Sequence, residues 1–352
     1  MPNLRQKISQ LICIGFHGSQ LNDAQELQHW LSASDGLGAL ILFDYDLQKK
    51  SYDKNIKSIE QLRQLTSDIK AFYQRHHPKS DPIWLAIDVE GGRVDRLARA
   101  QGYVPVPSSQ EIAQLSDEQR QVLWHQTASV LRHLNIDINF APVVDLDLSK
   151  EKGIFGPLKR CFSDNPAVVS KLSQEYLEVL NQYHILGCLK HFPGHGSAID
   201  DSHLDFVDVT DTFVLEELIP YHELCRHSEL LFSIMTAHVI NKNLDPLGLP
   251  ATLSYEMLTN TLRKEFNYQG IIISDDLQMH AISKYFSRRE ALLQTFLAGA
   301  DMVIFGNQLG CDTPQDVIDD IEYLVHDNSL DEHIIERAYQ RVVGYKKRLT
   351  AQ

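Results

Sequence analysis

The chain has 352 residues, with 33 Lys and Arg against 47 Asp and Glu, so its formal net charge is −14 at pH 7. This charge argues against a nucleic acid or an anionic membrane surface as a partner, because both require basic patches. No apolar run approaches the roughly 20 residues of a membrane span. The length allows one large α/β barrel or two small domains.

The N-terminal stretch and the cysteines indicate in which cellular compartment the protein is expected. The apolar run Leu11–Ile14 is too short for a signal-peptide core, and no small-residue cleavage site follows it. Of the five cysteines, Cys13 and Cys188 lie in apolar runs, which is typical of reduced core thiols. We therefore expect a cytoplasmic protein, although a chain whose leader had been removed would have the same composition.

Eight short apolar runs are expected to form strands. Because they are apolar on both faces, they predict a buried parallel sheet. The first of them could begin as a helix. The predicted strands are Ile8–Phe16, Leu37–Phe43, Ile83–Val89, Ile136–Val144, Gly187–His191, Leu231–His238, Gly270–Ser274 and Met302–Phe305.

Amphipathic patterns separate these strands and predict helices. The predicted helices are Ser58–Arg75, Asp117–Leu134, Pro166–Tyr183, Leu215–Arg226, Ser254–Phe266, Ser287–Ala298, Pro314–Asp327 and Asp331–Leu349. Strand–helix alternation repeated about eight times favours a single (β/α)8 barrel of the TIM type with C-terminal helices, spanning residues 1–352. An open doubly wound sheet is the alternative, because periodicity alone does not close a barrel.

Polar side chains follow the predicted strands at the end where barrel enzymes place their active sites. Asp145 and Asp276 fit a supporting or helix-capping role as well as direct contact with a ligand. The residues at the successive strand ends are Asp88 and Arg96, then Asp145, then Lys190 and His191, then His238, then Asp275 and Asp276, and finally Gly306 and Asn307.

The stretch Leu189–Asp205 reads as a strand that ends abruptly in a loop, because glycines and a proline follow its apolar start. In this loop Asp201 stands two residues before His203. A carboxylate this close can hydrogen-bond one ring nitrogen and leave the other for proton transfer. An imidazole with an ordinary pKa of about 6.5 suits general acid and base catalysis.

These residues, K-H-F-P-G-H-G followed by D-S-H, resemble the signature loop of glycoside hydrolase family 3, in its NagZ-type β-N-acetylglucosaminidase (β-N-acetylhexosaminidase) branch. Three further stretches resemble motifs of the same family. They are Asp88–Arg96 (D-x-E-G-G-R-V-x-R), Arg160–Ser163 (R-S-F-S, here with Cys161 in place of the small residue) and Ser274–Leu277 (S-D-D-L). The resemblance covers about Leu37 to Phe305.

The resemblance implies a role for each matching residue. Asp275 would be the nucleophile that forms a covalent glycosyl-enzyme, and His203 with Asp201 would be the acid/base dyad. Contacts with the sugar would come from Asp88, Arg96, Arg160, Lys190 and His191, while His238 would only line the pocket. Cys161 and the long loop Leu146–Leu158 depart from the family pattern and bear on the outer shape of the pocket.

The family further implies hydrolysis of terminal β-linked N-acetylglucosamine with retained configuration, with muropeptides of peptidoglycan recycling as the substrate. It implies no cofactor and no metal, and we expect a monomer. Many β-glucosidases of the family carry a second domain that supplies a glutamate acid. This chain ends soon after the predicted barrel, which favours the N-acetylglucosaminidase branch.

Three alternatives remain open from the residues alone. A metal-dependent barrel hydrolase could use a cluster drawn from His191, His195, His203, Asp200, Asp201 and Asp205. A glycoside phosphorylase is the second alternative, because a neutral histidine repels incoming phosphate less than a carboxylate does. The third is a sugar-binding barrel without catalytic activity.

Overall fold

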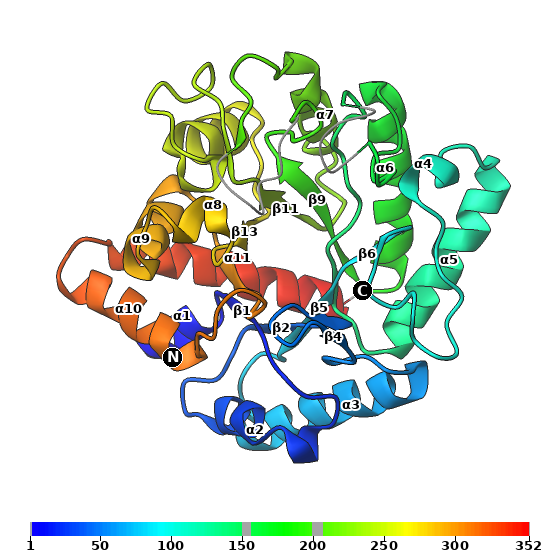
Figure 1. The fold of residues 1–352 in the computed structure, drawn as a ribbon. Coiled ribbons are helices and arrows are strands. Elements are labelled where there is room, and N and C mark those ends of the chain that lie inside the picture. The colour runs from blue at the N-terminus through cyan, green and yellow to red at the C-terminus, as the bar shows by residue number, and fades with distance from the viewer. Residues whose placement is uncertain (1, 150–155, 199–206, 352) are drawn as a thin grey trace.

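Eight parallel strands close into a barrel in the computed structural model, which describes residues 2–149, 156–198 and 207–351 (Figure 1). The strand order around the barrel is β1-β14-β13-β11-β9-β8-β5-β2. The strands are β1 Ile12–Gly15, β2 Ala39–Ile41, β5 Trp84–Ile87, β8 Ile138–Asn139, β9 Leu186–Phe192, β11 Phe232–Thr236, β13 Ile271–Asp276 and β14 Met302–Phe305. The predicted barrel is confirmed, and the open doubly wound sheet was the wrong alternative.

One principal helix follows each barrel strand, and together the helices surround the sheet (Figure 1). They are α2 Gln25–Ser32, α3 Ile59–His76, α5 Asp117–His133, α6 Pro166–Gln182, α7 Ile219–Leu224, the π-helix η4 Glu256–Glu265, α9 Arg288–Ala298 and α10 Pro314–His326. Shorter helical segments are η1 Leu21–Asp23, α4 Ser109–Ile112, η2 Leu215–Leu218, η3 Ala251–Leu253 and α8 His280–Ser283.

The observed helix starts agree closely with the predicted ones, because residues whose side chains cap a helix can be recognised in the sequence. Ser58, Ser116 and Ser287 each accept a hydrogen bond from the backbone N–H three residues on, which satisfies a donor that the helix leaves open. Asn165 caps α6 with proline at its first position. Helix α2, which the sequence did not predict, has eight residues and lacks such a side-chain cap.

The predicted first strand, Ile8–Phe16, was wrong at its start. A capping box between Asn3 and Gln6 begins helix α1, which spans Leu4–Ser9. The strand proper starts at Ile12, which pairs with Val303 of β14, and its pairing with β2 begins one residue later, between Cys13 and Ala39.

Helix α11, Glu332–Ala351, covers the N-terminal end of the barrel. Its buried Lys346 donates hydrogen bonds of 2.9 Å to Gln10 Oε1 and to the carbonyl oxygens of Gly38 and Pro82. These acceptors lie just before β1, β2 and β5. The N-terminal end is therefore packed against a helix, which leaves the C-terminal end for a site.

Short strands extend that C-terminal end. They are β3 Tyr45–Asp46 with β4 Ser51–Tyr52, β6 Val89–Gly91 with β7 Val94–Asp95, and β10 Val207–Asp208 with β12 Val239–Ile240. Each lies in a connection that follows a barrel strand. In the described ranges, no helix combines the length and the apolar character that crossing a bilayer would need.

Candidate active site

A cavity of about 460 Å³ lies at the C-terminal ends of the barrel strands, within the size range of small-molecule sites. Six of the eight residues that the sequence singled out line it: Asp88, Arg96, Arg160, Lys190, His191 and Asp275. The other two, Asp201 and His203, lie outside the described residues. The topology thus brings together side chains that lie up to 187 positions apart in the chain, from 88 to 275.

Glu90, a residue without a predicted role, ties the cationic part of this cavity together. Its carboxylate accepts two hydrogen bonds of 2.8 Å from the guanidinium of Arg160, and its Oε1 lies 2.7 Å from Lys190 Nζ. Lys190 also contacts Asp88, with 2.7 Å between Nζ and Oδ1. Such charge-assisted contacts are short and directional. Two carboxylates and two cations therefore form one connected cluster.

The cluster stays ionised despite its burial. Burial alone would raise the pKa of Glu90, but Arg160 and Lys190 hold that pKa well below its usual value. Burial alone would lower the pKa of Lys190, but Asp88 and Glu90 outweigh it and raise that pKa. Charged donors and acceptors are thus held in place before any ligand arrives.

Arg96 occupies the edge of the same cluster. Its guanidinium lies 3.8 Å from Asp88 Oδ2 and 3.7 Å from Asp44 Oδ1, and it sits over the ring of Phe43 at 5.6 Å. These ion-pair distances are longer than those around Glu90. We infer that Arg96 and Asp88 can exchange part of this contact for hydrogen bonds to a ligand.

Asp275 and Asp276 reach the cavity from the end of β13. Between Ile273 and Asp276 the pairing with β14 shifts register, so the strand carries one extra residue there. Asp275 is partly exposed, and its Oδ1 accepts a hydrogen bond of 2.7 Å from the backbone N–H of Asp276. Burial raises the pKa of Asp276 to about 7. Both adjacent carboxyl groups are partly exposed and both line the cavity.

Asp276 has a close backbone neighbour in Gly306 at the end of β14. A Cβ on Gly306 would lie 2.5 Å from Asp276 Oδ2, so any larger residue at this position would require the Asp276 carboxyl group to move. Asp276 Oδ1 also accepts from the backbone N–H of Gln278 at 3.0 Å. These contacts are typical of a carboxyl group that fixes the loop after β13, one of the two roles the sequence left open.

A second carboxylate, Asp145, holds the turn after β9. It accepts hydrogen bonds from the backbone N–H of His191 and of His195, and its Oδ2 lies 2.8 Å from His191 Nδ1. Burial raises the pKa of Asp145 to about 7. Burial and the cations Arg160 and Lys190 lower the pKa of His191 to about 3. The His191 ring is therefore neutral.

Glu217, from η2, supports the same turn from the other side. Its Oε2 accepts hydrogen bonds from the backbone N–H groups of Gly196 (2.9 Å) and Ser197 (3.3 Å). A Cβ on Gly194 would lie 2.6 Å from Glu217 Cβ, which explains a glycine with φ of +138° at that position. Burial raises the pKa of Glu217 to about 7.

The loop after β14 forms a less polar side of the cavity. Gln308 joins it to the loop after β2: its side chain accepts from Leu47 N at 3.0 Å and donates to Tyr45 O at 2.9 Å. Tyr45, Leu47, Gln308 and Leu309 all line the cavity. These residues could not be found from the sequence, because they lie outside its periodic segments.

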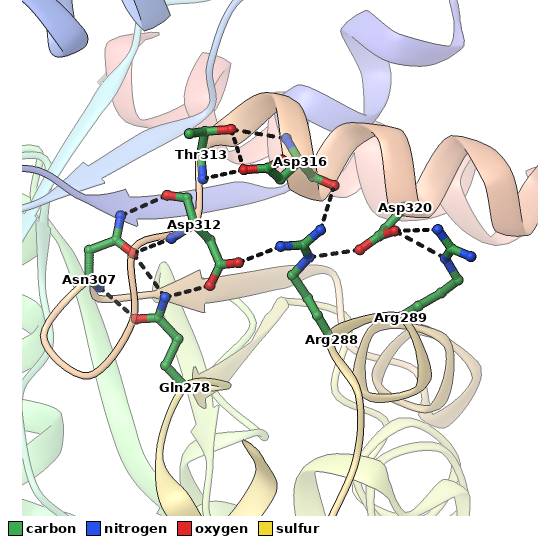
Figure 2. A network of polar contacts seen from close by, with 8 residues as sticks. All are labelled: Gln278, Arg288, Arg289, Asn307, Asp312, Thr313, Asp316 and Asp320. Carbon is green, nitrogen blue, oxygen red and sulfur yellow. Dashed lines mark hydrogen bonds and ion pairs between the residues drawn. The ribbon is translucent and has the colours of Figure 1, made fainter. Parts of the chain in front are cut away.

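A polar network behind this loop fixes its shape (Figure 2). Asn307 exchanges hydrogen bonds of 2.8 Å with the side chain of Gln278, and Gln278 also donates to Asp312 at 2.6 Å. Arg288 and Arg289 of α9 both bind Asp320 of α10, which extends the network between the two helices, as Figure 2 shows. The loops that follow β13 and β14 are thereby tied to one another.

Two sequence expectations concerned residues that do not reach the cavity surface. His238 is 1% exposed and donates from Nε2 to the carbonyl oxygen of Asp276 at 3.0 Å, so it supports the β13 end instead of lining the pocket. Cys161 is buried and packs against Val143. The substitution of cysteine at position 161 therefore affects packing beneath the cavity.

The metal-site alternative used His191, His195 and four residues that lie outside the described part of the chain. Within residues 2–149, 156–198 and 207–351, no three His, Cys, Asp or Glu side chains are grouped as metal ligands. The ring of His191 instead contacts a buried carboxylate, Asp145.

Comparison with known proteins identifies the family. Residues 3–344 match the family described as glycosyl hydrolase family 3 N terminal domain. The chain belongs to glycosyl hydrolase family 3. It is 32% identical over 306 residues to a beta-hexosaminidase of Alkalilimnicola ehrlichii, a match that covers 84% of this chain and 80% of the relative. It is also 32% identical over 296 residues to beta-hexosaminidase A of Pseudoalteromonas piscicida, covering 79% of this chain and 47% of the relative.

The fold has a close counterpart among family 3 structures. The β-N-acetylglucosaminidase from Paenibacillus sp. str. FPU-7 superposes with a TM-score of 0.86 at 27% identity, covering 99% of this chain and 63% of that one. The chain thus spans about half the length of the Pseudoalteromonas relative and less than two thirds of the Paenibacillus structure.

Replacing Glu217 with Gln tests how this carboxyl group is held. The native pKa of about 7 exceeds the ordinary value of 4.5, so the folded state keeps a proton that the unfolded chain has lost between these pH values. Glu217 should therefore reduce stability progressively as pH rises from about 4.5 to 7, by about 3 kcal/mol in total. Gln keeps an oxygen for both backbone N–H groups and carries no charge.

We expect Glu217→Gln to be more stable than the parent at pH 8 and close to it at pH 5, by urea unfolding. A variant that is less stable by the same amount at both pH values would show instead that a charged Glu217 stabilises the fold.

Proposed function

We propose that this protein is a retaining exo-β-N-acetylglucosaminidase that removes terminal β-linked N-acetylglucosamine. The observation that carries the proposal is the shared cavity, in which Asp275 faces the same space as Asp88, Arg96, Arg160, Lys190 and His191. The likeness to the Paenibacillus β-N-acetylglucosaminidase and to the beta-hexosaminidase relatives supports this substrate class.

In the proposed reaction the polar cluster binds the non-reducing sugar. Hydroxyl groups both donate and accept hydrogen bonds, and the cluster offers carboxylates that accept and cations that donate. Since Glu90, Asp88, Arg160 and Lys190 already neutralise one another, an uncharged sugar brings no net charge that the cluster must balance. This arrangement orients the anomeric carbon toward Asp275.

Catalysis then takes two steps. The Asp275 carboxylate attacks the anomeric carbon and the glycosidic C–O bond breaks, while His203, supported by Asp201, gives a proton to the leaving oxygen. Water, deprotonated by His203, next attacks the same carbon and releases Asp275. Two displacements at one carbon retain its configuration. The roles of His203 and Asp201 rest on the sequence motif, because both residues lie outside the described ranges.

We further propose that residues 1–352 act as one catalytic domain and as a monomer in the cytoplasm, on muropeptides from peptidoglycan recycling. The cysteines agree with a reducing compartment: all five lie in described segments as free thiols, and Cys13, Cys161 and Cys188 are buried.

Substrate preference tests the proposed activity. We expect kcat/KM for 4-nitrophenyl N-acetyl-β-glucosaminide to exceed that for the β-glucoside at least tenfold, since losing one hydrogen-bonded group costs about 1–3 kcal/mol. NMR should show the β-anomer as first product, and Asp275→Asn should abolish turnover of both substrates. A preference for the glucoside would contradict the substrate assignment.

The same assay separates the remaining alternatives. A hydrolase should release free N-acetylglucosamine in phosphate buffer, whereas a phosphorylase would release the sugar 1-phosphate. Activity should also survive a chelator, which a metal-dependent hydrolase would not.

Replacing His203 with Ala tests the acid role. With a poor leaving group we expect kcat/KM to fall by about 10²–10⁴-fold, because proton donation to the leaving oxygen is lost. With a dinitrophenyl leaving group, which departs without a proton, the loss should be much smaller. Equal losses for both substrates would remove His203 from the acid role.

A further inference from the structure

The strand that carries Asp275 loses its regular pairing just before this residue. Its pairing with β11 ends at Ile273, which lies opposite Met235. On the other side, the register with β14 shifts between Ile273 and Asp276, so one extra residue stands in β13 there. The regular ladder therefore does not fix the backbone at Asp275 from either side.

Buried hydroxyl groups take the place of the missing ladder contacts. On the β11 side, Thr236 Oγ1 accepts a hydrogen bond of 3.3 Å from the backbone N–H of Asp275. On the β14 side, Ser274 Oγ accepts a hydrogen bond of 3.0 Å from the backbone N–H of Ile304. Thr236 and Ser274 are both 0% exposed, so water does not compete for these contacts. The chain that leads into Asp275 is thus held from both neighbouring strands.

The peptide group that follows Asp276 is also held on both sides. His238 donates from Nε2 to the carbonyl oxygen of Asp276 at 3.0 Å. The backbone N–H of Leu277 donates to the carbonyl oxygen of Ile304, also at 3.0 Å. Between these fixed points lies the backbone N–H of Asp276, which donates to Asp275 Oδ1 at 2.7 Å. The direction of this N–H therefore decides where the Asp275 carboxylate points.

One hydroxyl group, that of Thr252 in η3, joins the two side-chain contacts from the β11 side. Its Oγ1 lies 2.7 Å from Thr236 Oγ1 and 2.8 Å from His238 Nδ1. The hydroxyl and the backbone N–H of Thr252 also contact Ala237 O, at 3.0 and 3.2 Å, which fixes the residue against β11. Thr252 is 0% exposed. Deleting its hydroxyl would therefore remove a hydrogen-bond partner from Thr236 and from His238 at once.

Building on the proposed function, we propose that Thr252 is a positioning residue for the nucleophile: its hydroxyl group holds Thr236 and His238, and through them the peptide groups on either side of Asp275. Thr252 is not among the described residues that line the cavity, so it acts without touching the sugar. A misplacement of about 1 Å at reacting atoms can cost on the order of 10²-fold in rate, so a small shift of this backbone matters.

Replacing Thr252 with Val tests the assignment, because Val keeps the shape of the side chain and lacks the hydroxyl. We expect kcat/KM for 4-nitrophenyl N-acetyl-β-glucosaminide to fall by about 10²-fold, and Thr252→Ser, which restores the hydroxyl, to recover most of this loss. The loss should be the same with a dinitrophenyl leaving group, because a misplaced nucleophile slows attack on either substrate. Inhibition by N-acetylglucosamine should stay as in the parent, because the sugar-binding cluster is unchanged.

Thr295→Val is the matched control. Thr295 of α9 is also 0% exposed, and its hydroxyl has no hydrogen-bond partner within the part of the chain that the structure describes. This variant should have the activity of the parent. Parent-like kcat/KM in Thr252→Val, or a Thr252→Ser that is as impaired as Thr252→Val, would overturn the proposal.

Rescue by azide separates positioning from a general structural role. In Asp275→Ala, azide attacks the anomeric carbon in place of the carboxylate, the bond to the leaving oxygen breaks, and nitrophenolate and the glycosyl azide form. Adding Thr252→Val to Asp275→Ala should leave this rescued rate unchanged, because no side-chain nucleophile remains to be positioned. A fall by the same factor as in the parent would give Thr252 a structural role and contradict the proposal.

Two further outcomes are assigned in advance. If Thr252→Val fails to fold, Thr236→Val, which removes the acceptor of the Asp275 N–H, should show the same loss with both leaving groups, and parent-like activity there counts against the proposal. If the parent hydrolyses no glucosaminide, or Asp275→Asn keeps its turnover, the proposed function fails. Hydrogen exchange of the Asp275 N–H then still decides the contact: it should be about threefold to tenfold faster in Thr252→Val than in the parent, and equal rates would refute the positioning contact.

Discussion

The site depends on one buried carboxylate, Glu90, that holds two cations in fixed positions. Arg160 comes from the segment after β8 and Lys190 from β9, while Glu90 itself lies in β6. Bringing three charges into a barrel interior costs several kcal/mol per ion unless they are paired and hydrogen-bonded. The geometry around Glu90 meets that condition, so the charges remain available at the cavity floor.

The same principle recurs in the turn after β9, with a different result. Asp145 and Glu217 are buried against backbone N–H groups, and Asp276, which is partly exposed at the cavity, lies against the β14 end; desolvation raises the pKa of each to about 7. These carboxyl groups hold backbone in place. Glu90, with cations beside it, keeps its charge. The neighbours of each carboxyl group therefore decide its role. Those beside backbone N–H groups fix the shape of the site, whereas Glu90, beside two cations, stays charged.

Much of this arrangement could be predicted from the sequence, because parallel strands bring residues at their C-terminal ends together. Asp88, Lys190 and Asp275 each follow an apolar run. For that reason they could be placed together at the C-terminal end of the barrel. Glu217 could not, since an acidic residue in an amphipathic stretch gives no sign of burial. The contact between Asp145 and His191 joins residues 46 positions apart and depends on how two strand ends turn. The loop contacts of Gln308 follow no periodic pattern.

The most direct measurement compares Glu90→Gln with Glu111→Gln, the same change at an exposed ion pair between Glu111 and Lys159. Neutralising Glu90 removes the carboxylate that holds the Arg160 guanidinium and leaves Lys190 with Asp88, and disrupting a buried ion pair in this way costs about 3–5 kcal/mol. We predict that kcat/KM for the nitrophenyl glucosaminide falls at least 10²-fold in Glu90→Gln and changes little in Glu111→Gln, where the exposed pair contributes about 0–1 kcal/mol. Parent-like activity and stability in Glu90→Gln would contradict the account.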